Sequence, residues 1–143
     1  MFATLADQHA QAAQMFEQIQ SHPLRRAVLW PELRRLLVSH EHAEVRELYP
    51  VLRQYGQTFA LANDHDAEAC QLDALIGRLD TLPIDSAPWG AVFDQLVVTV
   101  LHHAKEVEEQ QIFPVAQQVL GEARALELDA KLAMAQQPLA LAN

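Results

Sequence analysis

The sequence predicts an all-α protein, an up-down-up-down four-helix bundle with a short C-terminal helical extension. Three observations support this. Apolar residues recur at helical spacing along almost the whole chain, no segment alternates like a strand, and only 4 of the 143 residues are glycine and 7 proline. Half of the residues are apolar and a fifth are charged, which is typical of a globular domain. We expect residues 1–121 to form the bundle and residues 122–143 to form a C-terminal helix with a frayed tail.

The first helix is predicted over about residues 4–20. Thr4 and Asp7 form an N-cap pattern at its start, and the Ser21-His22-Pro23 segment ends it. Its expected buried stripe consists of Leu5, Ala12, Phe16 and Ile19.

The second helix is predicted over about residues 24–54, with Gly56 as its stop. Pro31 is either the first helical position or a kink, and Pro50 is expected to bend or end the helix. Its expected buried side consists of Leu33, Leu36, Leu37, Leu48 and Val51.

The third and fourth helices are predicted over about residues 58–80 and 88–120, joined by a loop. Gly121 is expected to stop the fourth helix, and a shorter helix follows over about residues 122–135. This last segment either packs on the bundle or mediates dimerisation. The expected buried positions are Leu61, Leu72, Leu75, Ile76 and Leu79 in the third helix, and Phe93, Leu96, Val100 and Val107 in the fourth.

Charge and cysteine content exclude several functional classes. The formal net charge of −9 argues against nucleic acid or an anionic membrane as a partner. The single cysteine, Cys70, allows neither an intrachain disulfide nor a CxxC-type zinc site, and we expect it to pack in the core. No apolar run is long enough to cross a membrane and no signal peptide is evident, so a cytoplasmic location is expected. Four arginines are expected to form a solvated face: Arg25, Arg26, Arg34 and Arg35.

A histidine interrupts the apolar stripe of each of the four long helices: His9, His40, His65 and His103. Glu44 follows His40 at i+4 and shares its helix face. Because buried imidazoles and carboxylates without partners cost several kcal/mol, such a convergence predicts a cation at the bundle centre. Imidazole and carboxylate without thiolate suit iron, manganese or zinc rather than calcium, and glutamates on two helices favour a dinuclear centre.

The fourth helix offers two histidine–glutamate pairs. His102 with Glu106 is a regular i+4 pair, whereas His103 with Glu108 is an i+5 pair that needs a π-bulge or local unwinding. We favour His103 and Glu108, because Glu108 and Glu44 each stand six residues before a proline that follows an aromatic residue. Two histidines are predicted to be non-ligands, since one lies on the opposite helix face and the other in a turn: His42 and His22.

At these residues the sequence resembles the hemerythrin-like family, also called the HHE cation-binding domain, over about residues 4–120. The resemblance rests on the His40-x-x-x-Glu44 block before Tyr-Pro, the His-His and Glu-Glu block before Phe-Pro, and the single histidines at 9 and 65. It implies a four-helix bundle that holds two non-haem iron ions with an oxo or hydroxo bridge. The implied terminal ligands are His9, His40, His65 and His103, and the implied bridging carboxylates are Glu44 and Glu108.

One position departs from the family pattern. True hemerythrins carry a second histidine one turn after the third-helix histidine, where this chain has Ala69, with Glu68 beside it as a substitute ligand. An open coordination position, or one filled by water or Glu68, favours reactivity toward O2, NO or peroxide, or iron sensing, over simple oxygen carriage.

We therefore expect a monomeric or homodimeric protein that binds or senses O2, NO or iron, rather than a turnover enzyme. Two alternatives stand beside it. The first is a di-iron enzyme acting in nitric oxide handling or in the repair of iron centres. The second is a metal-free helical interaction module, whose histidines are satisfied by each other and by glutamates.

Overall fold

The computed structural model describes residues 2–135, and every secondary-structure element in this part of the chain is helical, as predicted, with no strand. None of its helices combines the length and the apolar character needed to span a bilayer. The end of the predicted frayed tail, residues 136–143, lies outside the described residues.

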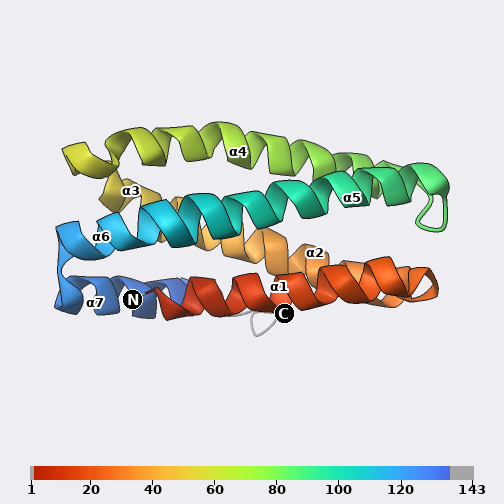
Figure 1. Cartoon of the computed structure of the whole chain (residues 1–143), viewed down its shortest axis with the longest axis horizontal. Helices are drawn as coiled ribbons and strands as arrows, with labels where there is room; N and C mark the ends of the chain where they lie inside the picture. The colour runs from red at the N-terminus through yellow and green to blue at the C-terminus, as the bar shows by residue number, and fades with distance from the viewer. Residues whose placement is uncertain (1, 136–143) are drawn as a thin grey trace.

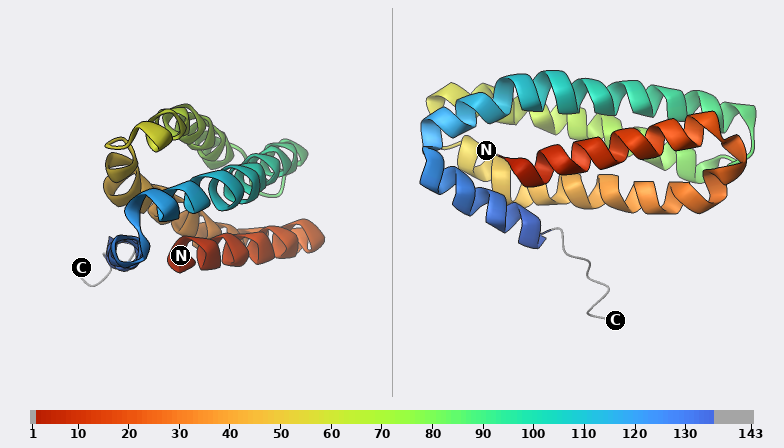
Figure 2. Two further views of the ribbon diagram at one scale, coloured as in Figure 1. Left: turned by 60° about the vertical axis from the view of Figure 1, so that its left-hand side comes forward. Right: turned by 60° about the horizontal axis from the view of Figure 1, so that its bottom comes forward.

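The elements in chain order are α1 (Ala3–Ser21), the 3-10 turn η1 (Pro23–Arg25), α2 (Arg26–Ala43), the π-helix η2 (Glu44–Leu48), α3 (Tyr49–Leu52), α4 (Gly56–Thr81), α5 (Ala87–Leu101), the π-helix η3 (His102–Ile112), α6 (Phe113–Leu120) and α7 (Glu122–Ala135). Because η2 and α3 continue α2, and η3 and α6 continue α5, the chain forms long rods. Figure 1 shows these rods side by side, with consecutive rods running in opposite directions. The right-hand view of Figure 2 shows α7 turned back from α6, and α7 contacts α1, α6 and η2.

The start of α1 differs from the prediction. The helix begins at Ala3 with Phe2 at the N-cap position, so the expected Thr4 cap is wrong. The backbone N–H of Thr4 instead donates to Oδ1 of Asp129 in α7, at 3.0 Å. A side chain from a distant helix thus satisfies one of the free N–H groups of the first turn, while Phe2, only 1% exposed, is drawn into the core.

The second rod also begins and ends differently. Pro31 lies inside α2, which begins at Arg26, so Pro31 is not a first helical position. The rod ends at Leu52, two residues after Pro50, and Gly56 begins α4 rather than stopping the preceding helix. Proline cannot donate to the preceding turn, which is consistent with a rod that ends so soon after it.

Two surface predictions are wrong. Cys70 is exposed on α4 rather than packed in the core. The Arg26 guanidinium lies 5.1 Å from the Trp89 ring centroid and donates to the Ile84 carbonyl at 3.2 Å, so Arg26 joins the start of α2 to the α4–α5 loop. A Cβ at Gly90 would meet Nη2 of Arg26 at 2.9 Å, so a larger residue there would push the guanidinium aside.

The core consists of two apolar clusters. One joins α1, α2, α4 and α5, and the other joins Phe2, the η2–α3 and η3–α6 segments and α7, in which Ala125, Leu128 and Leu132 are buried. On α1, Leu5 belongs to the second cluster and Ala12 to the first, and His9 stands between them. The packing of α7 supports the first of the two alternatives for the C-terminal segment.

Candidate metal centre

The structure brings all six predicted ligand residues together between the two apolar clusters. The six residues, called the His–Glu cluster below, are His9 on α1, His40 on α2, Glu44 on η2, His65 on α4, and His103 and Glu108 on η3. Their side chains are buried or nearly so, from 0% exposed for Glu108 to 19% for His103. Every long rod therefore contributes at least one polar group to a single interior point.

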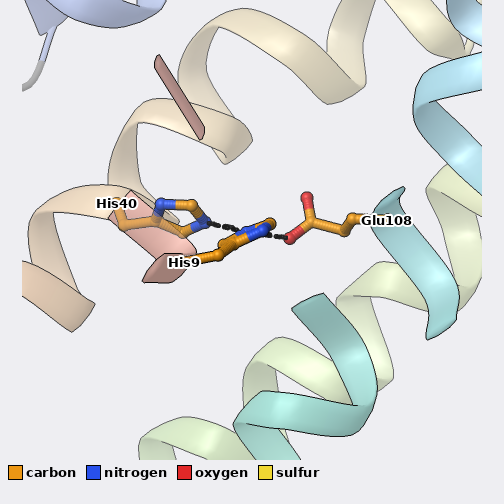
Figure 3. A group of neighbouring side chains, drawn as sticks. All are labelled: His9, His40 and Glu108. Atoms are coloured by element: carbon orange, nitrogen blue, oxygen red, sulfur yellow. Dashed lines mark hydrogen bonds and ion pairs between the residues drawn. The ribbon is translucent and has the colours of Figure 1, made fainter. Parts of the chain in front are cut away.

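The first half of the cluster consists of His9, His40 and Glu108. Nε2 of His9 lies 3.3 Å from Nε2 of His40 and 3.1 Å from Oε1 of Glu108. Figure 3 shows the two rings turned toward one another, with the Glu108 carboxylate beside the His9 ring. One ligand atom from each residue lies within 4.8 Å of the other two, which is close enough to hold one metal ion.

The second half consists of Glu44, His65 and His103, which meet the same 4.8 Å limit. Each glutamate also approaches a histidine of the other half. Oε1 of Glu44 lies 3.2 Å from Nε2 of His40, and Oε1 of Glu108 lies 3.2 Å from Nε2 of His103. Both carboxylates therefore stand between the two groups of histidines, as bridging ligands would.

Local backbone geometry places the two glutamates. Both lie in π-helical segments, and their carbonyls accept i→i−5 hydrogen bonds from the N–H groups of Tyr49 and Phe113. The wider π turn aligns residues five apart, which brings His103 and Glu108 to the same side of η3. The sequence predicted this unwinding in the fourth helix but not the matching segment in the second.

Three of the four histidines are oriented by groups outside the cluster. Nδ1 of His9 contacts Oε2 of Glu109 at 2.8 Å, and Nδ1 of His40 contacts Oε1 of Gln8 at 2.7 Å. Nδ1 of His103 contacts a carboxylate oxygen of Glu68. Carboxylate and amide oxygens only accept, so each Nδ1 donates, and in the neutral ring the lone pair is left on Nε2, facing inward.

This arrangement suits a cation. The Nε2 lone pairs of His9 and His40 face each other across 3.3 Å, next to a carboxylate oxygen of Glu108, and such a group repels itself unless a positive charge lies among them. Further buried atoms lack a hydrogen-bond partner within residues 2–135: Oε2 of Glu44, Oε2 of Glu108 and Nδ1 of His65. The residues present fit a metal centre, because coordination would satisfy the clustered lone pairs.

Protonation also favours metal binding. Burial, together with the nearby His40, lowers the pKa of His9, so that its ring is neutral near pH 7. Burial raises the pKa of Glu44, but His40 and His65 outweigh this and hold it well below its usual range. Neutral imidazole and ionised carboxylate are the forms that bind metals.

The remaining predicted candidates lie outside the cluster. His102 and Glu106 form a 2.7 Å pair at the surface, each 60% exposed, and His42 and His22 are exposed as well. Glu68 lies behind His103 rather than between the two halves of the cluster. Of the two pairs of the fourth helix, His103 and Glu108 lie in the cluster, whereas His102 and Glu106 lie at the surface.

Sequence reasoning missed several neighbours of the cluster. Gln8 and Glu109 stand beside His9 and Glu108 in the chain, but nothing in their spacing shows that each accepts from a histidine on another rod. The Tyr49 ring stacks on His65 with centroids 3.8 Å apart, and burial raises the pKa of its hydroxyl well above the usual value. The spacing of the sequence indicates an aromatic residue before Pro50 but not its contact with His65.

A cavity of about 390 Å³ is lined by all six residues of the His–Glu cluster and, among others, by Ala69. Glu41 also lines it, and burial, with Asp73 nearby, raises the pKa of this carboxyl to about 8.

Comparison with known proteins places the sequence in a family. Neither a curated protein nor a solved structure matched the chain. The sequence model described as the hemerythrin HHE cation binding domain matches residues 1–116, a span that contains all six residues of the His–Glu cluster. The chain therefore belongs to the hemerythrin HHE cation-binding domain family.

Proposed function

We propose that the chain is a non-haem di-iron protein that binds or senses O2, NO or iron, built on an up-down-up-down four-helix bundle over residues 1–121. One observation carries this proposal. Six buried or nearly buried ligand groups form two sets of three, and each carboxylate stands between histidines of both sets. A cytoplasmic location and a monomeric or dimeric state complete the proposal.

The two sets assign the ligands. His9, His40 and Glu108 would hold one ion, and Glu44, His65 and His103 the other, with Glu44 and Glu108 shared between them. The ligands are nitrogen and oxygen donors without thiolate, which suits iron, and also manganese or zinc as substitutes. The iron pair would supply one-electron redox steps and an open coordination position for a diatomic ligand.

The protein's own groups prepare this chemistry. Gln8, Glu68 and Glu109 accept from Nδ1 of three rings and hold their Nε2 lone pairs toward the centre. The apolar clusters on both sides limit access of water. Ala69 leaves the α4 side open toward the cavity, which supports entry of a diatomic molecule there.

Metal analysis of protein purified from iron-supplemented cells tests the proposal directly. We expect two iron ions per chain, and charge-transfer bands of a bridged diferric centre in the optical spectrum after exposure to O2. Protein that carries one iron or none after anaerobic loading with ferrous iron would contradict a di-iron centre.

A variant tests the bridging role. Glu44→Ala removes a carboxylate shared by both sets, so the iron content should fall from two to at most one per chain. Glu106→Ala is the matched control, because Glu106 also pairs with a histidine but at the surface, and it should keep two. Unchanged stoichiometry in Glu44→Ala would overturn the bridging assignment.

A further inference from the structure

The C-terminal helix α7 lies beyond the span that matches the family, yet it lies close to the His–Glu cluster. The family match ends at residue 116, whereas α7 covers Glu122–Ala135. Figure 1 shows α7 beside the start of α1, and α7 contacts both α1 and η2. These are the segments that carry His9 and Glu44. A helix without any proposed iron ligand therefore contacts two segments that hold such ligands.

Two ligand rings pack against the apolar cluster that α7 completes. Within this cluster, the Phe113 ring lies parallel to the His9 ring, with centroids 6.0 Å apart. The Tyr49 ring, in the same cluster, stacks on His65 with centroids 3.8 Å apart. The α7 helix contributes three buried side chains to it: Ala125, Leu128 and Leu132. Detachment of α7 would therefore expose part of the cluster that supports both rings.

A hydrogen bond also joins α7 to the start of α1. Oδ1 of Asp129 accepts from the backbone N–H of Thr4 at 3.0 Å, and the N-cap residue of α1 supplies no side-chain acceptor. Without Asp129, this N–H would lose its acceptor and the first turn would fray more easily. His9 follows Thr4 by little more than one turn, and so does Gln8, the acceptor for His40. Fraying from the first turn would thus reach one ligand and the residue that orients another.

The attachment of α7 is weaker than the packing of the long rods. The helix has 14 residues, a length at which an isolated helix is only marginally stable in water, so its helical form depends on docking. It is joined to α6 through Gly121 alone. Terminal elements with few buried side chains open more easily than the core of a fold. Detachment of α7 therefore needs less free energy than unfolding of the whole bundle.

From these observations we propose that α7 is a strap that retains iron at the His–Glu cluster. While α7 is docked, it holds the start of α1, with His9, and the η2 segment, with Glu44, in place. Iron leaves when α7 detaches and these segments loosen. By linkage, bound iron strengthens the docking of α7 in turn. The proposal rests on the di-iron centre proposed above and adds its regulation by a helix that carries no ligand.

The rate of iron release tests the strap on the iron-loaded protein, measured as anaerobic transfer of ferrous iron to an excess of a chromogenic chelator. Leu132→Ala removes a fully buried side chain of α7 and should speed release at least about tenfold. Leu79→Ala is the matched control, because Leu79 is only 2% exposed but belongs to the other apolar cluster. It should stay within about twofold of the parent rate although it also lowers stability.

The outcomes of this comparison are distinct. Leu126→Ala, at an exposed position of α7, should release iron as the parent does. Equal acceleration in Leu132→Ala and Leu79→Ala would overturn the strap, because loss of global stability would then account for release. A parental rate in Leu132→Ala would also overturn it, because iron would then leave by another route, such as the cavity.

The hydrogen bond to α1 gives a second test. Asp129→Ala removes the acceptor of the Thr4 N–H and should speed release about 2- to 30-fold, the equivalent of roughly 0.5–2 kcal/mol for a lost N-cap acceptor. Asp129→Asn keeps an acceptor oxygen and should release iron as the parent does. A parental rate in Asp129→Ala would overturn the strap, because the start of α1 would then not depend on α7.

Hydrogen exchange distinguishes a strap from a helix with a purely structural role. The Thr4 amide reports docking, because its acceptor lies on α7. Iron loading should slow the exchange of this amide, and in Leu132→Ala its exchange should rise together with iron release. Exchange that does not respond to iron would overturn the proposal. Two irons per chain with unchanged release in the α7 variants contradict the strap alone, whereas a parent without iron contradicts the di-iron centre and the strap with it.

Discussion

In three of the four histidines of the His–Glu cluster, the ring nitrogen that points away from the centre of the cluster contacts a hydrogen-bond acceptor. These acceptors are Gln8 for His40, Glu109 for His9 and Glu68 for His103. Each fixes the tautomer and the orientation of its ring, and each comes from a neighbouring part of the fold rather than from the ring's own turn. The position of Glu68 also explains why a chain with Ala69 in place of a histidine does not gain a direct ligand from the adjacent residue.

We predict that Glu68→Ala weakens metal binding about 10- to 100-fold, because His103 loses the acceptor that orients it. Competition with a chelator of known affinity measures the change. Glu68→Gln, which keeps an acceptor oxygen, should recover much of the affinity. Glu106→Ala is the control at the exposed His102 pair and should not change it. A Glu68→Ala protein with parental affinity would show that the contact does not position the ring.

Among the helical elements, the two π segments explain the spacing of glutamate, aromatic residue and proline that the second and fourth helices share. In both, a glutamate carbonyl accepts from the N–H of the aromatic residue that precedes a proline, Tyr49 or Phe113. Pro50 and Pro114 have no N–H, and in a regular helix their rings would meet the carbonyl four residues before. A wider turn before each proline relieves that contact and turns the glutamate inward.

Substitutions at two glycines test the backbone conformation at a helix end and in a helix interior. Gly121 between α6 and α7 has φ 82° and ψ 163°, a conformation that is essentially restricted to glycine, so Gly121→Ala should lower the free energy of unfolding by about 1–3 kcal/mol. Gly77 lies inside α4 with free space around its Cα, so Gly77→Ala should raise it by about 0.5–1 kcal/mol. Urea denaturation measures both. The same sign for the two variants would contradict this conformational argument.

The C-terminal helix offers a matched pair for its packing. Leu132 of α7 is fully buried, so Leu132→Ala should lower the free energy of unfolding by about 2–5 kcal/mol. Leu126, on the same helix, is 55% exposed, and Leu126→Ala should change it by less than about 0.5 kcal/mol. Thermal and urea unfolding of both variants measures the two changes. If α7 were a loosely attached extension, both variants would lose equally little free energy of unfolding.

Across the whole molecule, a polar layer separates two apolar clusters. Because its carboxylates and imidazoles are desolvated, this layer opposes folding unless a cation balances it. A bound metal should therefore stabilise the folded chain by mass action, by about 4 kcal/mol at a free concentration a thousand times the Kd.

Metal removal tests this prediction. Dialysis against a chelator should lower the Tm of the parent protein, and readdition of ferrous iron should restore it. Glu108→Ala lacks one of the shared carboxylates, so the difference in Tm between its metal-free and its iron-loaded form should be smaller than in the parent protein. A Tm that does not respond to metal would favour the metal-free interaction module instead.

Local spacing in the sequence by itself determined the all-helical class, the histidine-bearing stripes and the family, because helical periodicity and short motifs depend on residues within a few turns of one another. Predictions from the same spacing were wrong where residues distant in the sequence determine the local structure. Phe2 and Asp129 set the start of α1, Trp89 draws Arg26 inward, and Cys70, which was expected in the core, is exposed. Only the tertiary structure decided which acceptor stands behind each histidine and how wide the cavity beside Ala69 is, since both depend on the relative placement of separate rods.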